Sequence, residues 1–461
     1  MSTENSADLR NRKSSCLITG VSYICASHGK DNEMKILVVG SGGREHAICW
    51  KLSKSKLVSK IYCAPGNAGI ASIGECVPVA VDDIAGLIDL VTRECIDLTV
   101  VGPELPLTLG IVDEFEAKGL RIFGPTKEAA VIEGSKAFAK QFMRTHHIPT
   151  APFKIFDDRE EALRFCDETR YPLVIKADGL AAGKGAVIVD NVEQAKNTVD
   201  KMMLDKVFGE AGNKVVIEDK LVGEEITVMA FTDGKTIIPM LPSQDHKQAF
   251  DNDEGPNTGG MGAYCPVPFV SDNLMIDILD LILEPTVRGL TAEGRTFKGI
   301  LYAGLMVNER GPKVIEFNCR FGDPETQVVL PLLQNDLAEI FISIADGNLS
   351  LEEPTWKDKY SVCVIMASDG YPGSYEKGKR ISNLPKKELD QSVVFHAGTK
   401  LENGNIVTSG GRVLGVTRLA ENLHDSIAGA YDLVKNIKFE GAFYRSDIGQ
   451  KATRRRSKFS R

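Results

Sequence analysis

Residues 35–47 read KILVVGSGGREHA, and this stretch decides the fold of the first part of the chain. An apolar run ends in a glycine-rich loop, and an amphipathic helical pattern follows at 47–57. Further short apolar runs lie at 60–63, 97–101 and 120–123. Their continuous hydrophobic character is typical of buried parallel strands. The pattern predicts a doubly wound α/β domain with a parallel sheet over residues 34–135.

The glycine loop lies at the expected start of a helix, where free backbone N–H groups and the helix dipole favour an anion. Arg44 in this loop favours phosphate. Glu45 stands where the dinucleotide fingerprint G-x-G-x-x-G requires glycine, so the loop does not match that motif. The alternative is that the glycines only form a tight turn.

The pattern changes twice in the rest of the chain. Residues 136–352 mix strands and helices, and residues 353–450 predict a small β-rich domain. The expected fold class is therefore α/β and α+β multidomain: an N-terminal doubly wound parallel sheet, central domains and a β-rich C-terminal domain. Residues 1–33 predict a disordered leader. The basic tail 451–461 predicts a solvated end, with nuclear import or anion binding as the alternative.

Length and composition exclude several classes of protein. The 461 residues agree with about three domains at roughly 150 residues each. With 43% hydrophobic and 26% charged residues, the chain is neither fibrous nor disordered. A net charge of −8 gives no electrostatic reason to bind nucleic acid, and no run approaches the ~18 apolar residues of a membrane span. Ten scattered cysteines without a C-x-x-C pair predict reduced thiols in the cytosol.

A second glycine-rich loop, KADGLAAGKG at 176–185, joins two strand-like runs. It is not a Walker A loop, because only three residues separate Gly179 from Gly183. A glycine loop between strands can fold over the phosphates of a nucleotide, and Lys176 would reach them. A flexible hairpin tip is the alternative.

Three other polar segments are candidates for binding. The segment EDKLVGEE at 218–225 can read an adenine edge through its backbone, and Glu225 can accept from ribose hydroxyls, although an ordinary acidic turn explains it equally well. The segment PNTGGMGA at 256–263 is typical of a binding loop. QDHK at 244–247 groups Asp245 with two possible cations, and a polar surface turn is the alternative.

The most specific chemical signal is VIEFNCRFGDPE at 314–325. On a strand, Glu316 and Asn318 share one face, and two hard oxygen ligands suit a magnesium ion that bridges ATP phosphates. Arg320 continues that face and offers a planar fork for a carboxylate or phosphate. A salt-bridged polar strand face is the alternative. The chain contains no nucleophile elbow and no histidine pair with metal-ligand spacing, so covalent catalysis by a side chain is not expected.

Taken in order, the segments at 35–47, 244–247, 256–263 and 317–327 resemble the phosphoribosylamine-glycine ligases, also called glycinamide ribonucleotide synthetases. These are ATP-grasp enzymes of purine synthesis, and the resemblance runs from residue 34 to about 449. It implies that residues 136–352 form the ATP-grasp domain, with a lid subdomain at about 150–222. It implies that ATP phosphorylates glycine and that the amine of 5-phosphoribosylamine attacks the glycyl phosphate, giving glycinamide ribonucleotide, ADP and phosphate. It also implies ATP with Mg²⁺ or Mn²⁺ as cofactors, a cytosolic location and, as possible partners, other purine-pathway enzymes, with no nucleic acid or membrane partner.

The resemblance also implies roles for single positions. The metal ligands would be Glu316 and Asn318. The ATP contacts would be Lys136, Lys176, Glu218, Asp219, Lys220, Leu221, Glu225 and Asn257. Glycine is assigned to Asp245 and Arg320, and the sugar phosphate to Gly42, Gly43 and Arg44. The residues expected to act in catalysis are Arg320, Asp245 and Lys176.

Three features depart from the family pattern. Gln248 stands where relatives commonly carry an arginine that contacts ATP, and the leader 1–33 has no recognised counterpart. The basic tail replaces the apolar residues or the fused later-pathway domains that usually follow, which suggests a single-function form such as a truncated product of a longer gene. Two other functions remain as alternatives: a related ATP-grasp carboxylase or ligase for another acid, and a catalytically silent nucleotide-binding subunit. The presence of both Glu316 and Asn318 disfavours the silent subunit.

Overall fold

The computed structural model describes residues 33–180, 185–349, 353–385 and 389–452. The predictions for the leader up to residue 32, for the glycine-loop residues 181–184 and for the tail from residue 453 therefore lie outside the described residues. The expected domain boundaries stay predictions.

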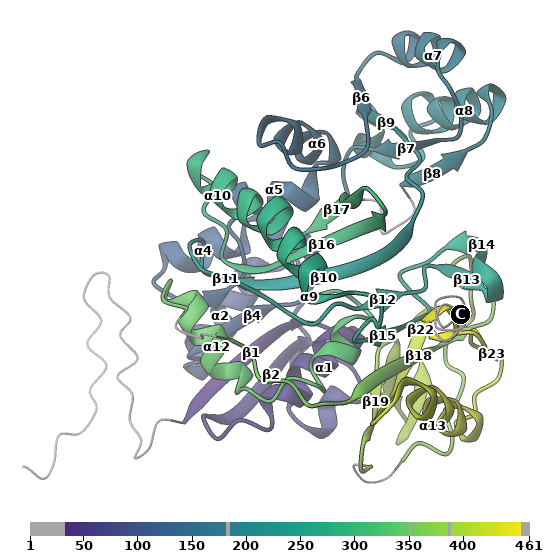
Figure 1. Ribbon diagram of the computed structural model, residues 1–461. Coiled ribbons are helices and arrows are strands. Elements are labelled where there is room, and N and C mark those ends of the chain that lie inside the picture. The colour runs from purple at the N-terminus through teal and green to yellow at the C-terminus, as the bar shows by residue number, and fades with distance from the viewer. Residues whose placement is uncertain (1–32, 181–184, 350–352, 386–388, 453–461) are drawn as a thin grey trace, which may run out of the picture. The chain divides into compact units, whose positions relative to one another are not determined.

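The N-terminal part is a parallel sheet with strand order β3-β2-β1-β4-β5, as expected for a doubly wound domain (Figure 1). Its strands are β1 (Met34–Gly40), β2 (Val58–Pro65), β3 (Glu75–Cys76), β4 (Leu98–Val101) and β5 (Ile122–Phe123). Its helices are α1 (Gly43–Leu52), α2 (Ile84–Glu94), α3 (Glu104–Leu109), α4 (Ile111–Ala117) and α5 (Lys127–Gly134). The strand order reverses between β1 and β4, and the glycine loop follows β1 at that point, where α/β folds bind ligands.

Helix α1 begins earlier than the sequence pattern predicts. Its first residue is Gly43 rather than one near residue 47, and it ends at Leu52 rather than 57. The Glu45 side chain accepts from the backbone N–H of the N-cap residue Gly42, and this contact supports the start of the helix inside the glycine-rich stretch.

The central part contains two antiparallel sheets, with strand orders β6-β9-β7-β8 and β11-β10-β16-β17. The first comprises β6 (Phe153–Phe156), β7 (Leu173–Ala177), β8 (Ala186–Val189) and β9 (Val215–Asp219), with helices α7 (Arg159–Glu168) and α8 (Val192–Val199) packed on it (Figure 1). The second comprises β10 (Glu224–Thr232), β11 (Ile237–Pro239), β16 (Gly299–Asn308) and β17 (Gly311–Asn318). The nearby helices are α6 (Lys136–Thr145), α9 (Asp272–Ile278), α10 (Glu284–Ala292), α11 (Thr326–Val329) and α12 (Leu337–Ala345).

The β-rich C-terminal sheet is not built from C-terminal residues alone. Its order is β12-β15-β18-β22-β19, with β23 paired to β18, and helix α13 (Leu423–Asn436) packs on β18 and β22. The strands are β12 (Gln244–Asp245), β15 (Gly262–Cys265), β18 (Tyr360–Ser368), β19 (Ser392–His396), β22 (Arg412–Ala420) and β23 (Ala442–Phe443). Two small pairs accompany it: β13 (Gln248–Phe250) with β14 (Glu254–Asn257), and β20 (Thr399–Glu402) with β21 (Asn405–Thr408). The QDHK and PNTGGMGA segments thus join the central part to this sheet.

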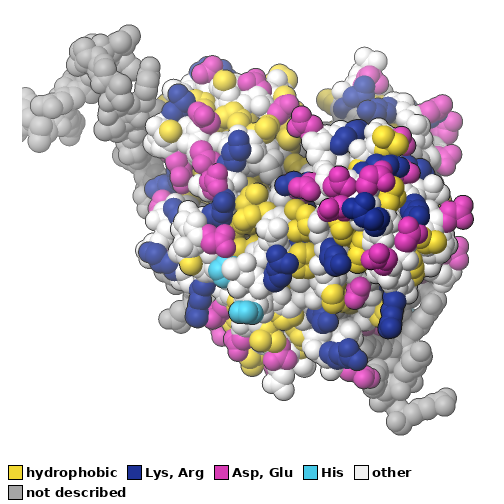
Figure 2. Space-filling model, turned by 90° about the horizontal axis from the view of Figure 1, so that it is seen from above, with side chains coloured by type: hydrophobic (Ala, Val, Ile, Leu, Met, Phe, Trp, Pro, Cys, Tyr) yellow, Lys and Arg dark blue, Asp and Glu magenta, His cyan; other side chains and the backbone are white. Residues whose placement is uncertain are grey.

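Within the described part of the chain, no helix is both long and apolar enough to cross a membrane. On the face that Figure 2 shows, acidic and basic side chains intermingle around patches of hydrophobic side chains.

Candidate active site

The predicted metal ligands lie together near the end of β17. Gly304 and Tyr302 of β16 are the register partners of Glu316 and Asn318, so both predicted ligands share one face of the sheet. Both side chains are only partly exposed. The carboxylate and amide oxygens are therefore placed side by side, as the spacing predicts.

Three lysines act on Glu316: Lys136 of α6, Lys176 of β7 and Lys247 between β12 and β13, and we call them the lysine cluster. Burial opposes ionisation of Glu316, but the charges of Lys247, Lys176 and Lys136 outweigh it and lower the pKa of this carboxyl group. Lys247 lies 3.9 Å from the Glu316 carboxylate. Lys176 Nζ donates to the carbonyl of Ile315 at 3.0 Å, which ties the lid sheet to β17. Such a cluster can attract a polyphosphate.

Glu218, a predicted ATP contact, holds two buried lysines. Lys176 pairs with its carboxylate at 2.6 Å, and Lys140 pairs with the other carboxylate oxygen. Burial lowers the pKa of Lys140 to about 8, although Glu218 opposes this shift. Sequence reasoning missed Lys140. Its spacing of four residues from Lys136 on helix α6 was the available signal, since such residues share a helix face.

Lys136 and the second glycine loop are joined at their base. Lys136 Nζ donates to the carbonyl of Gly179 at 2.8 Å. Asp178 accepts from the hydroxyl of Ser135 at 2.9 Å and from the N–H of Ala137 at 3.0 Å. The start of helix α6 is therefore fixed to the described part of this loop.

Asp245 and Glu225 lie on the other side of the lysine cluster. Lys247 forms an ion pair with Glu225. Burial raises the pKa of Asp245 to about 8, because the opposing charge of Lys247 is offset by the neighbouring carboxylates Glu325 and Glu225. We therefore expect Asp245, a partly buried residue, to hold its proton near neutral pH.

The predicted ATP contact Asn257 touches the residue that departs from the family pattern. Gln248 Nε2 donates to Asn257 Oδ1 at 3.4 Å across the β13–β14 pair. A neutral amide therefore stands where the resemblance implies a cation.

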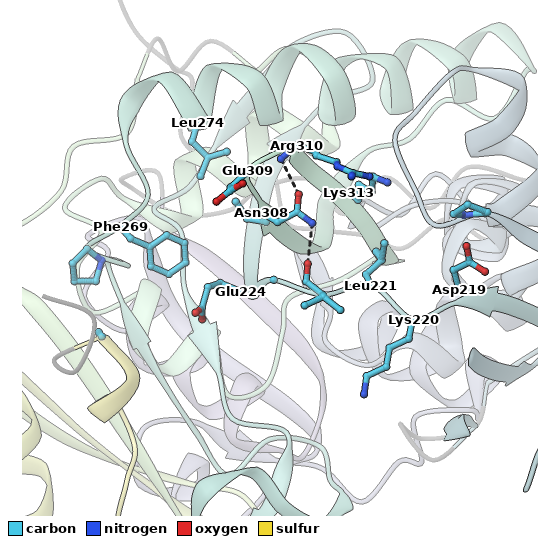
Figure 3. A pocket seen from close by; sticks show the side chains of 16 residues that line it. Asp219, Lys220, Leu221, Glu224, Phe269, Leu274, Asn308, Glu309, Arg310 and Lys313 are labelled. Carbon is cyan, nitrogen blue, oxygen red and sulfur yellow. Dashed lines mark hydrogen bonds between the residues drawn. The ribbon is translucent and has the colours of Figure 1, made fainter. Parts of the chain in front are cut away.

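A cavity of about 1140 Å³ adjoins the expected adenosine segment (Figure 3). Its lining includes Asp219, Lys220 and Leu221, the turn between β16 and β17, and apolar side chains such as Phe269 and Leu274. Glu224 also lines it, whereas the next residue, Glu225, contacts the lysine cluster. Because successive strand residues point to opposite faces, the cavity lies on the face of β10 away from that cluster.

The predicted phosphate loop is already occupied by acids of the chain itself. The N–H of Gly42 donates to Glu45, and the N–H of Arg44 donates to Asp323 at 3.3 Å. The Arg44 side chain is buried, with Nε 2.6 Å from Glu45 and Nη1 donating to the carbonyl of Phe321 at 3.0 Å. The guanidinium of Arg44 therefore does not point at an open phosphate site.

Arg320 lies between two carboxylates from the N-terminal part of the chain. Its Nε is 3.3 Å from Glu104, and its Nη2 is 3.0 Å from Glu133 and 3.3 Å from Asn318 Oδ1. Its Nη1 donates to the carbonyl of Phe321 at 3.2 Å. The sequence predicted that the Arg320 guanidinium would bind a substrate carboxylate. Most of its N–H donors are instead engaged within the protein.

A second missed group is the pair Asp323 and Arg412. Arg412, on the C-terminal strand β22, donates to the carbonyls of Gly259 and Asp323, each at 2.6 Å. Burial opposes ionisation of Asp323, but Arg412 and Arg44 outweigh it and lower its pKa. These contacts join the glycine loop after β1, the PNTGGMGA loop and the C-terminal sheet. No local sequence pattern predicts them.

Two antiparallel sheets that bring lysines to a paired carboxylate and amide define an ATP-grasp enzyme. Models described as the N domain, the ATP-grasp (A) domain and the C domain of phosphoribosylglycinamide synthetase match residues 34–133, 134–326 and 361–451. The chain belongs to the phosphoribosylglycinamide synthetase family, as its motifs predicted.

Two curated relatives match about nine-tenths of this chain. A phosphoribosylamine–glycine ligase of Caldanaerobacter subterraneus is 52% identical, with 90% of this chain and 99% of the relative covered. The human trifunctional purine biosynthetic protein adenosine-3 is 49% identical over 91% of this chain, which corresponds to 42% of that protein.

Solved structures show the same fold. Phosphoribosylamine–glycine ligase from Thermotoga maritima superimposes with a TM-score of 0.79 at 34% identity, covering 90% of this chain and 100% of that one. A biotin carboxylase domain of Hydrogenobacter thermophilus, in complex with MgADP and bicarbonate, has a TM-score of 0.70 at 17% identity, covering 90% and 92%. The second likeness concerns the fold alone.

Proposed function

We propose that this chain ligates glycine to 5-phosphoribosylamine with ATP, through glycyl phosphate, in purine biosynthesis. The observation that carries the proposal is the lysine cluster around Glu316, because it can hold a triphosphate beside a metal ligand. Glycine carboxylate is a poor electrophile, and transfer of the γ-phosphoryl group to its oxygen creates a good leaving group. The amine of phosphoribosylamine then attacks the carbonyl carbon, and phosphate leaves. Family membership and the names of the relatives support these substrates.

Glu316 and Asn318 would hold Mg²⁺ or Mn²⁺. A carboxylate and an amide oxygen fit a hard divalent cation. Among the described residues, no three or more acidic, histidine or cysteine side chains are grouped so that they could hold an ion, so the phosphate oxygens of ATP would complete the coordination. When bound, such an ion neutralises charge on the phosphates.

The nucleotide would be held by two sets of residues. Lys136 and Lys176 would approach its phosphates, as their place in the lysine cluster supports. The adenosine would contact the segment of Glu218, Asp219, Lys220 and Leu221, with Glu225 and Asn257 as further contacts.

The amino acid would be bound beside the phosphates by Asp245 and Arg320. Because Arg320 is already engaged by two acids, binding of the glycine carboxylate would require it to exchange the longer of these contacts, that to Glu104 at 3.3 Å. Arg320, Asp245 and Lys176 are the proposed catalytic residues. For the sugar phosphate, we propose Gly42, Gly43 and the backbone of Arg44 rather than its guanidinium.

The physiological setting follows from the same proposal. The human relative is named a trifunctional purine biosynthetic protein, which supports contact of this chain with other enzymes of the pathway in the cytosol.

The test is phosphate release by the full chain with ATP, magnesium and freshly formed phosphoribosylamine. We expect turnover only when glycine is present, with glycinamide ribonucleotide as the product. Turnover that is independent of glycine, or that bicarbonate or another amino acid supports equally, would contradict the proposal and favour a different ATP-grasp ligase.

A further inference from the structure

Glu133 is a buried carboxylate on helix α5 that the proposed mechanism does not use. Its residue is 9% exposed. It accepts from the backbone N–H of Cys319 at 2.7 Å and from Arg320 Nη2 at 3.0 Å. Glu133 therefore accepts from the backbone of Cys319 and the side chain of Arg320, the two residues that follow the proposed metal ligand Asn318.

The contact continues from Arg320 to Asn318. The same Nη2 that reaches Glu133 lies 3.3 Å from Asn318 Oδ1. An asparagine amide has an oxygen that can bind a hard cation and a nitrogen that cannot, and rotation by half a turn exchanges them. Because the Arg320 guanidinium can only donate hydrogen bonds, it favours the amide orientation in which Oδ1, rather than the amide nitrogen, lies beside it. Partners that orient a metal ligand in this way commonly change metal affinity 10- to 100-fold.

Building on the proposed metal site, we propose that Glu133 is a positioning residue that acts through Arg320 to hold the amide oxygen of Asn318 toward the divalent cation. Glu104 provides the matched comparison. It also pairs with Arg320, through Nε at 3.3 Å, but no hydrogen bond joins it to Cys319 among the described residues. Both acids compensate the charge of Arg320, whereas only Glu133 contacts the nitrogen that faces Asn318.

Direct Mn²⁺ binding tests this role. Free and bound Mn²⁺ would be measured by electron paramagnetic resonance with the full chain and ADP. We expect Glu133→Gln to weaken Mn²⁺ binding about tenfold and Glu104→Gln to weaken it less than about threefold. The loss expected for Glu104→Gln measures the effect of removing one carboxylate charge beside Arg320. Equal losses in the two variants, or no loss in Glu133→Gln, would overturn the proposal.

A double-mutant cycle separates orientation from general damage. In Asn318→Asp, either carboxylate oxygen can bind the ion, so orientation by Arg320 is no longer needed. We expect Glu133→Gln to cost about tenfold in Mn²⁺ affinity with Asn318 present and less than about threefold in the Asn318→Asp background. The same cost in both backgrounds would show that Glu133 only supports the fold, and the proposal would fail.

The proposed metal site can fail separately. If wild-type chain with ADP binds no Mn²⁺, or if Glu316→Ala binds it as tightly as the wild type, the metal assignment itself is wrong. If Glu316→Ala abolishes binding while Glu133→Gln leaves it unchanged, only the role of Glu133 is wrong. Thermal melts of each variant identify any that does not fold. If Glu133→Gln does not fold, Glu133→Asp takes its place, and binding as tight as in wild type after this shortening would overturn the proposal.

Discussion

The lysine cluster around Glu316 and the glycine loop before helix α1 both bring many hydrogen-bond donors together, but they differ in what already satisfies them. In the cluster, three cations surround one proposed metal ligand, and their combined charge lowers the pKa of Glu316. In the loop, Glu45 and Asp323 accept from the backbone donors, and Glu45 also pairs with Arg44. Lys176 and Lys247 of the cluster also pair with Glu218 and Glu225, so a polyphosphate would compete with these carboxylates for the two lysines. In the glycine loop, Glu45 and Asp323 already accept from the backbone donors, so fewer donors remain for a ligand.

The largest expected effect is that of removing the acid at the centre of the lysine cluster. Glu316→Ala should lower the rate of ligation about 1000-fold, because a proposed metal ligand and the balance of three lysine charges are lost. The measurement is formation of glycinamide ribonucleotide at saturating ATP. Glu116→Ala, at an exposed position on helix α4, is the control and should stay within about twofold of wild type. A Glu316→Ala enzyme with wild-type activity would show that the chemistry lies elsewhere.

Arg44 should behave as a structural residue. Arg44→Gln leaves the buried Glu45 without its cation, so the free energy of unfolding should fall by about 3 kcal/mol, as measured by urea denaturation. The KM for phosphoribosylamine should stay within about twofold of wild type. A tenfold rise in that KM with unchanged stability would mean that the guanidinium binds the substrate phosphate after all, and the contrast between the two regions would disappear.

Lys176 and Lys140 allow a comparison within the nucleotide site. Both pair with Glu218, but Lys176 is the one whose charge acts strongly on Glu316. Lys176→Met should raise the KM for ATP about tenfold, and Lys140→Met should raise it less, while both lower stability because Glu218 loses a partner. Steady-state kinetics with varied ATP decide this. If Lys140→Met had the larger effect on the KM, the assignment of Lys176 to the phosphates would be wrong.

A further expected effect is on the pH dependence of stability. Burial raises the pKa of Asp245 to about 8, so the folded chain keeps this proton where the unfolded chain has released it. The contribution of Asp245 to stability therefore falls as pH rises from about 4 to about 8. Thermal melts of Asp245→Asn should lose less stability than wild type between pH 5 and pH 8. The exposed control Asp205→Asn should show the same change of stability with pH as wild type. If Asp245→Asn also showed that same change, the raised pKa of Asp245 would be contradicted.

Sequence reasoning succeeded where chemistry and local pattern coincide. The apolar run before the glycine loop predicted β1, and the spacing of two placed Glu316 and Asn318 on one face of β17. The resemblance assigns both Lys176 and Glu218 to ATP, which stays a prediction, and the two side chains form an ion pair. These outcomes depend on periodicity within single elements or on motifs with fixed spacing.

The remaining features depend on partners that lie far apart in the sequence. Glu133 meets Cys319 across 186 residues, and Arg412 meets Gly259 across 153 residues. The position of the Arg44 side chain has a local cause, because Glu45, next in the chain, accepts from the Gly42 N–H and pairs with the guanidinium. A glycine loop before a helix therefore predicts an anion but does not say whether the protein provides it.

Transfer of ¹⁸O from glycine carboxylate tests the central claim most directly. With doubly labelled glycine, ATP and phosphoribosylamine, the account predicts that each released phosphate carries one ¹⁸O atom, because a carboxylate oxygen attacks the γ-phosphorus and leaves with it. Phosphate without the label during formation of glycinamide ribonucleotide would contradict the glycyl phosphate pathway.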